Sequence, residues 1–268
     1  MTHIAPTTPK PGSKVKLADY DPGERGGMTK DDALIELAEL RTRLGDLQNM
    51  LYADERFAVL FVLQAIDTAG KDSTINSVFQ EVGPIGCQVA SFKVPTPEEL
   101  AHDYLWRYRK QTPEKGHITI FNRSHYESVL VERVKDIVPK KTWEARYDDI
   151  NEWERYLVRN GTIVLKFFLY ISNDEQRERL QERVDNPKKQ WKFRMGDLED
   201  RKLWDKYIEA YEDALMRCNT EEAPWHIVPA NHKWYRDLIV ARALVKKLES
   251  LDLRYPPAEP GVVGLKVE

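Results

Sequence analysis

The segment VLFVLQAIDTAGKDSTI, residues Val59–Ile75, decides the fold of this chain. It begins within an apolar run, Ala58–Leu63, of the kind found in strands that a parallel sheet buries on both faces. The run breaks into a short polar loop, Asp67–Asp72, after which a helix is predicted over Ser73–Phe79. This order of strand, loop and helix predicts a phosphate-binding site, because the loop amides and the helix N-terminus would point at one spot.

The loop resembles the Walker A pattern G-x-x-x-x-G-K-[ST] and departs from it at two positions. Ala65 stands in place of the first glycine, and Asp72 stands in place of the Ser or Thr that binds magnesium. The plainer alternative is a chance Gly-Lys pair at a turn, where the glycine only supplies a positive φ. We favour the phosphate loop because the pair directly follows the most strand-like run in this half of the chain. The predicted phosphate contacts are Thr68, Ala69, Gly70, Lys71, Asp72 and Ser73.

A second polar cluster, Asn122–Glu127, follows the predicted strand His117–Phe121. In open parallel sheets ligands bind beyond the carboxyl ends of the strands, so this cluster should face the phosphate loop. A helix N-terminus capped by Asn122 or Ser124 explains the same residues equally well. Asn122 stands where phosphate-transfer sites usually carry an aspartate.

The departures from the usual pattern change the expected metal ligands. A hard cation takes oxygen ligands, and no hydroxyl follows Lys71 to supply one. Asp67 is the best candidate within the loop, and Glu127 is the nearest carboxylate after the third strand. We therefore predict that Asp67 and Glu127 bind Mg²⁺.

The strongest local charge bias lies between Arg183 and Arg194, where five basic residues face one acidic residue. The plain alternative is a solvated surface, balanced by Asp197, Glu199 and Asp200. We favour a lid that closes over phosphates, because a phosphate loop already precedes it. The residues assigned to phosphate contact on this lid are Arg183, Lys188, Lys192 and Arg194.

The composition excludes several classes of protein. The chain has 268 residues, with 41 basic and 44 acidic side chains and a net charge of −3. It therefore lacks the overall positive charge that is typical of nucleic-acid-binding proteins. Its two cysteines, Cys87 and Cys218, form no metal spacing and suit a reducing compartment. It shows neither an apolar stretch of transmembrane length nor a signal-peptide core. We therefore expect a cytoplasmic protein that binds neither nucleic acid nor membrane.

The remaining elements complete an alternating α/β pattern with a parallel five-stranded sheet flanked by helices. The expected domains are an extended, solvated arm at 1–28, a main domain at 29–254 with a lid at about 184–200, and a C-terminal tail at 255–268. The further helices are predicted from the Thr29 cap to Leu51, from the Thr96 cap to about Gln111, and over Trp143–Asn160, Asn173–Asp185, Leu198–Arg217 and Trp234–Leu251. The further strands are Gln88–Phe92, Thr162–Ile171 and Trp225–Val228.

Three segments together resemble the polyphosphate kinase 2 family, a branch of the P-loop kinases with a fold similar to thymidylate kinase. They are LQAIDTAGKDSTI (Leu63–Ile75), IFNRSHYE (Ile120–Glu127) and NPKKQWKFRMGDLEDRKLWDKY (Asn186–Tyr207). The resemblance runs from about Met28 to Arg254. Asn122, where many members carry Asp, matches the branch that uses both nucleoside mono- and diphosphates.

The resemblance implies Mg²⁺-dependent transfer of a phosphoryl group from inorganic polyphosphate to AMP or ADP. Asp67, Lys71, Arg123 and Glu127 are the expected catalytic residues, and Asn122, Arg123 and His125 the expected nucleotide or phosphate contacts near them. His125, as a lone histidine, is more often structural than a ligand. A homo-oligomer is also expected.

Two other functions fit the same residues. An ATP-dependent nucleoside monophosphate kinase would use the same loop, sheet and lid. A regulatory nucleotide-binding protein without catalysis would explain the missing Ser or Thr after Lys71 and the Asn at position 122. Synthesis of ADP and ATP from polyphosphate and AMP alone separates the first of these from the polyphosphate-dependent enzyme.

Overall fold

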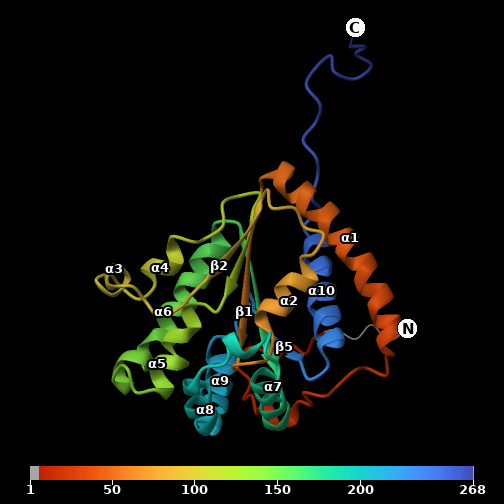
Figure 1. The fold of residues 1–268 in the computed structure, drawn as a ribbon. Helices are drawn as coiled ribbons and strands as arrows, with labels where there is room; N and C mark the ends of the chain where they lie inside the picture. The colour runs from red at the N-terminus through yellow and green to blue at the C-terminus, as the bar shows by residue number, and fades with distance from the viewer. Residues whose placement is uncertain (1–5, 268) are drawn as a thin grey trace.

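The computed structural model describes residues 6–267, and a five-stranded sheet lies at its centre (Figure 1). The strands follow the order β2-β3-β1-β4-β5, and every neighbouring pair is parallel. They span β1 (Ala58–Ala65), β2 (Cys87–Ser91), β3 (Ile118–Asn122), β4 (Thr162–Tyr170) and β5 (Trp225–Pro229). The predicted α/β fold with a parallel five-stranded sheet is therefore confirmed.

Helices cover both faces of the sheet, with α1, α2 and α10 on one side and α5, α6 and α9 on the other (Figure 1). The α-helices are α1 (Lys30–Asp54), α2 (Lys71–Val78), α3 (Pro97–Leu100), α4 (Trp106–Arg109), α5 (Val131–Val134), α6 (Lys140–Arg159), α7 (Asn173–Asp185), α8 (Met195–Lys202), α9 (Trp204–Arg217) and α10 (Lys233–Glu249). Short 3₁₀ helices are η1 (Leu17–Asp19), η2 (His125–Ser128) and η3 (Gln190–Lys192). No helix within residues 6–267 is both long and apolar enough to span a membrane.

The burial of the central strand β1 explains why residues Ala58–Leu63 form an unbroken apolar run. All eight of its residues are buried. Successive side chains point to opposite faces, so Phe61 packs with α1, α2 and α10, whereas Leu60 and Val62 pack with α6 and α9. A strand that is covered on both faces has no polar side, which is why the apolar run does not alternate.

The register of the sheet brings the two polar clusters together. Leu63 of β1 lies opposite Asn122 of β3, and the Arg123 N–H donates to the Leu63 carbonyl at 3.2 Å. The loop after β1 and the residues after β3 therefore leave the same edge of the sheet side by side. This is the arrangement that the parallel-sheet argument predicted for Asn122–Glu127.

Two predicted helices are broken. The helix expected between Thr96 and Gln111 is divided into α3 and α4, because the Asp103 carboxylate accepts a hydrogen bond from the Leu105 N–H at 3.1 Å and caps a new turn. The helix expected over Leu198–Arg217 is interrupted at Leu203, whose φ and ψ of −93° and 15° lie outside the helical range.

The N-terminal arm packs against the body of the protein, so the expectation of a solvated tail is wrong for the described part of it. Val15 is 3% exposed and Leu17 is fully buried. Thr7 forms an antiparallel bridge with Ile227 of β5. The arm shows no helical or strand periodicity, and its buried residues are spaced irregularly, so its packing leaves no pattern in the sequence. At the other end, residues 255–267 form no helix or strand and extend away from the body (Figure 1).

Candidate active site

The loop between β1 and α2 adopts the backbone conformation of a tight phosphate-binding turn. Thr68 and Gly70 have φ values of 71° and 102°, in the left-handed region. The Gly70 carbonyl accepts hydrogen bonds from the Thr74 N–H at 2.9 Å and the Ser73 hydroxyl at 2.8 Å, which begins α2 directly at Lys71. The positive end of the α2 dipole therefore opens at this loop.

Four charged side chains from two strand ends meet above the loop. Arg123 donates to Asp67 at 3.3 Å and to Glu127 at 3.1 Å, so one guanidinium links a residue after β1 to a residue after β3. Arg123 itself has a φ of 64°, which is uncommon for a residue with a side chain and aims the guanidinium into the cluster. The structure thus brings together the four residues that the sequence assigned to catalysis, Asp67, Lys71, Arg123 and Glu127.

The cluster shifts the pKa values of Lys71, Asp67 and Arg123, and Glu127 raises that of Arg123. Burial and the nearby Arg123 lower the pKa of Lys71 to about 8, against the opposing effect of Asp67. Burial alone would raise the pKa of Asp67, but the positive charges of Lys71, Arg123 and Arg183 outweigh it and hold that pKa below its usual value. The Lys71 ammonium donates to the Ala65 carbonyl at 3.0 Å. A polyanion entering here would meet a lysine and an arginine at one point.

Asp72, which departs from the Walker A pattern, contacts Asn122, which stands where phosphate-transfer sites usually carry an aspartate. The Asn122 amide donates to the Asp72 carboxylate at 2.6 Å. A carboxylate at position 122 would instead face Asp72 with a like charge, so Asn at 122 suits Asp at 72. Asp72 is exposed in the first turn of α2, where its charge also favours the helix dipole.

The structure does not bring all predicted lid residues to the loop. Arg183 lies near Asp197 at 3.5 Å and affects Asp67 electrostatically. Lys188, Lys192 and Arg194 are exposed, and within residues 6–267 no hydrogen bond or ion pair joins their side chains to the phosphate loop. Their contact with phosphate stays a prediction.

The prediction that His125 contacts phosphate or nucleotide is wrong, because this side chain is fully buried in the core. Its Nε2 lies 3.1 Å from the Glu154 carboxylate, which also accepts from Tyr126 and Lys166 inside the core. Burial lowers the pKa of the imidazole, despite the neighbouring Glu154. The side chain therefore belongs to the buried core beside β3.

Asp197 at the start of α8 is a site residue that the sequence reading missed. Its carboxyl lies beside that of Asp67, and burial together with the Asp67 charge raises the Asp197 pKa. The sequence showed Asp197 only as one of several acids that could balance the lid. The only indication in the sequence was that Asp197 directly follows the basic segment. Its contact with Asp67 could not be predicted, because the two residues are far apart in the sequence.

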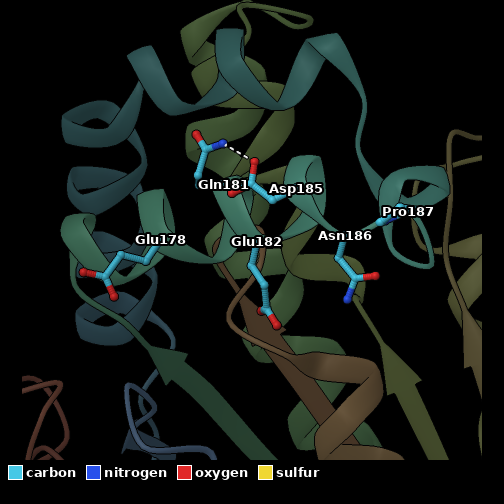
Figure 2. Close-up of a pocket in the computed structure, with 6 residues that line it drawn as sticks. All are labelled: Glu178, Gln181, Glu182, Asp185, Asn186 and Pro187. Carbon is cyan, nitrogen blue, oxygen red and sulfur yellow. Dashed lines mark hydrogen bonds between the residues drawn. The ribbon is translucent and has the colours of Figure 1, made fainter.

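None of the four clustered charged residues lines the cavity along the exposed side of α7. Figure 2 shows its lining residues, Glu178, Gln181, Glu182, Asp185, Asn186 and Pro187, around a volume of about 540 Å³. Three of these side chains are acidic, and Gln181 is tied to Asp185 at 2.8 Å. Such a surface repels a polyanion.

The chain matches the model of the family described as Polyphosphate kinase 2 over residues 27–256. It is 54% identical over 261 residues to an AMP/ADP-polyphosphate phosphotransferase of Meiothermus ruber, covering 97% of this chain and 98% of that one. It is 46% identical to an ADP-polyphosphate phosphotransferase of Rhodopseudomonas palustris, covering 93% and 91%. The crystal structure of polyphosphate kinase 2 from Arthrobacter aurescens TC1 superposes with a TM-score of 0.91 at 41% identity, covering 97% of each chain.

Proposed function

The chain belongs to the polyphosphate kinase 2 family, and we propose that it transfers the terminal phosphoryl group of inorganic polyphosphate to AMP and ADP. It is an enzyme, a phosphotransferase with a P-loop kinase fold. The observation that carries this proposal is the Arg123 guanidinium, which joins Asp67 and Glu127 beside Lys71 at the edge of the sheet. Cationic and anionic groups at one point suit a reaction between two polyanions in the presence of a metal.

The chemistry asks mainly for alignment and charge neutralisation. The acceptor is a nucleotide phosphate, which is already an ionised nucleophile above its second pKa, so no general base has to activate it. We assign Lys71 and the loop amides to the donor phosphates. Arg123, with Arg183 behind it, balances the charge on the phosphoryl group as it moves. The other contacts predicted from the sequence remain part of the proposal, except His125.

The residues present fit a hard divalent cation. Asp67, Glu127 and Asp197 offer only oxygen donors, and the raised pKa of Asp197 beside Asp67 reflects burial and a carboxylate repulsion that a cation would relieve. Within residues 6–267 no group of three or more His, Cys, Asp or Glu side chains is arranged to hold a metal by itself. Mg²⁺ keeps several waters and needs only one or two carboxylates. We propose that Asp67 and Glu127 hold Mg²⁺, which would neutralise charge on the phosphates when bound.

The deciding experiment supplies polyphosphate and AMP with Mg²⁺ and no ATP. We expect ADP first and ATP afterwards, and the Lys71→Ala variant to lose about a hundredfold in rate or more, since it removes a fixed charge from the moving phosphates. Retained circular dichroism shows that this variant is folded. Activity only when ATP is supplied would favour the ATP-dependent monophosphate kinase and contradict the proposal.

The remaining predictions from the sequence concern assembly and location. We propose a homo-oligomer without a nucleic-acid partner, which light scattering after size-exclusion chromatography and a nucleic-acid binding assay would test. A cytoplasmic location is proposed from the two free cysteines, Cys87 and Cys218. Cell fractionation tests it.

A further inference from the structure

Two buried arginines from different helices donate hydrogen bonds to main-chain carbonyls of the phosphate loop. Arg179 on α7 is 6% exposed and Arg236 on α10 is 1% exposed. They lie far apart in the sequence and on different helices, yet both donate to the Ala69 carbonyl, at 3.1 Å and 3.0 Å. Burying a guanidinium is costly unless its donors are satisfied, so their common target needs a reason.

Every donor nitrogen of Arg179 has an acceptor. One terminal nitrogen donates to the Thr68 and Ala69 carbonyls, each at 3.1 Å. The other donates to the Ala230 and Asn231 carbonyls after β5, at 2.7 Å and 3.0 Å, and Nε donates to Glu175 at 2.7 Å. The rigid fork of one guanidinium therefore fixes the phosphate loop to the loop after β5.

Arg236 adds a second attachment to the loop, from α10. Beyond the Ala69 carbonyl, it donates to the Ser73 hydroxyl at 3.1 Å and to Asp237 at 2.8 Å. It also fills the space against Gly70: a Cβ on that residue would lie 2.1 Å from the Arg236 Nη1. Glycine at position 70 is thus required by this arginine as well as by its φ of 102°.

These contacts orient the loop amides. In a planar trans peptide the C=O and the following N–H point in opposite directions. Because both arginines donate to the Ala69 carbonyl, the Gly70 N–H is directed away from their guanidinium groups. The left-handed Thr68, with a φ of 71°, is held in the same way through its carbonyl. The loop lacks the first glycine of the usual pattern, and the arginines supply an external constraint instead.

We propose that Arg179 and Arg236 are positioning residues, which fix the phosphate loop for phosphoryl transfer without touching the substrate. The inference rests on the proposed function and extends it to two residues outside the charged cluster. A loop that shifts by about an ångström loses the alignment on which the rate depends, and such errors cost up to about a hundredfold.

The test compares Arg179→Lys and Arg236→Lys with the wild-type protein, using polyphosphate and AMP as substrates. Lysine keeps the positive charge but cannot hold two carbonyls in a fixed fork. We expect kcat to fall about 10- to 100-fold while the KM for AMP stays within about twofold, because the fault lies in alignment. A wild-type protein without polyphosphate-dependent activity would refute the proposed function, whereas an active wild type with unchanged kcat in both variants would refute only this inference.

Arg133→Lys is the matched control. Arg133 is also largely buried and pairs with Asp213 at 2.6 Å and Glu209 at 2.7 Å, joining α5 to α9 away from the phosphate loop. We expect this variant to lose a similar amount of melting temperature and to keep its kcat. If it loses as much kcat as the loop variants, the effect is general destabilisation and the inference is wrong.

A milder variant covers the case in which the lysine variants do not fold. Glu175→Gln removes only the charge that holds the Arg179 Nε. We expect a loss of a few-fold in kcat at constant KM for AMP, measured well below the melting temperature. Wild-type kcat in a folded Glu175→Gln protein, in the absence of folded lysine variants, would overturn the proposal.

Discussion

Lys71 is held in an environment that makes its charge sensitive to pH near 8. Its ammonium form is complete below that pH and is lost as the pH rises through it, because burial and Arg123 both disfavour the charge. Bound phosphate adds negative charge beside the lysine and raises its pKa again. The free enzyme and the substrate complex therefore differ in the pH at which the lysine loses its proton.

From this difference we predict that kcat/KM for polyphosphate declines above about pH 8, while kcat declines only at higher pH. The measurement is a pair of pH–rate profiles above pH 7, where the nucleotide phosphates are ionised. Lys71→Arg keeps its charge at every pH used, so its residual activity should lack the decline near pH 8. A decline that survives in Lys71→Arg would belong to another group.

The metal assignment can be tested at three carboxylates of the same site. We predict that Asp67→Asn and Glu127→Gln each reduce turnover and raise the Mg²⁺ concentration for half-maximal rate, because each removes an anionic ligand. Asp72→Asn should leave that midpoint almost unchanged, since Asp72 is bonded to the Asn122 amide. A magnesium titration of initial rate compares the three variants. If Asp72→Asn alone moves the midpoint, Asp72 is the ligand and the assignment is wrong.

At the scale of the elements, the basic segment between α7 and α8 separates into residues with different partners. Lys189 forms an ion pair with Glu182. Lys188 and Lys192 are exposed, and Lys192 lies over the Trp191 ring at 5.1 Å, which leaves both ammonium groups accessible to an anion. A lid that binds the polyphosphate chain would use the accessible lysines.

We predict that replacing Lys188 and Lys192 together with Gln raises the KM for polyphosphate several-fold and leaves the KM for AMP nearly unchanged. The wild-type KM for polyphosphate should also rise with ionic strength, and the variant should show a weaker dependence. Lys189→Gln is the control, and its KM should stay near the wild-type value. Equal rises for both substrates would mean that the segment does not act on the donor alone.

The strands were predictable from the sequence to within a residue or two, because burial on both faces makes β1 and β4 predominantly apolar. The helix breaks were not, and the first of them depends on a single side chain. Asp103 looks like any polar residue on a helix until its carboxylate caps Leu105.

The residues of the site likewise fall into those that the sequence predicts and those that it does not. Asp67, Lys71, Arg123 and Glu127 lie next to strand ends, where parallel topology fixes their meeting place. Arg179, Arg236 and Asp197 reach the loop from α7, α10 and α8, and their contacts depend on how those helices dock. The spacing of residues in the sequence does not predict how these helices pack against the loop.

Across the whole molecule, the N-terminal arm joins parts of the structure that are distant in sequence. Leu17 is fully buried in the hydrophobic cluster beneath α6 and α9, and its N–H donates to Glu212 of α9 at 2.7 Å. Thr7 pairs with Ile227 at the free edge of β5, with hydrogen bonds of 3.2 Å and 2.9 Å. The arm thus covers an edge strand that would otherwise present unpaired main-chain groups, and it completes one of the two cores.

We therefore predict that Leu17→Ala destabilises the whole protein, although it lies outside the expected main domain. Removing a fully buried leucine side chain typically costs about 2–5 kcal/mol, which corresponds to a fall in melting temperature of at least several degrees for a protein of this size. Thermal unfolding followed by circular dichroism measures it. Leu265→Ala is the matched control, because Leu265 is 67% exposed in the C-terminal tail and its loss should leave the melting temperature unchanged. Equal melting temperatures for the wild type and Leu17→Ala would show that the arm contributes nothing to stability, and that the core is closed without it.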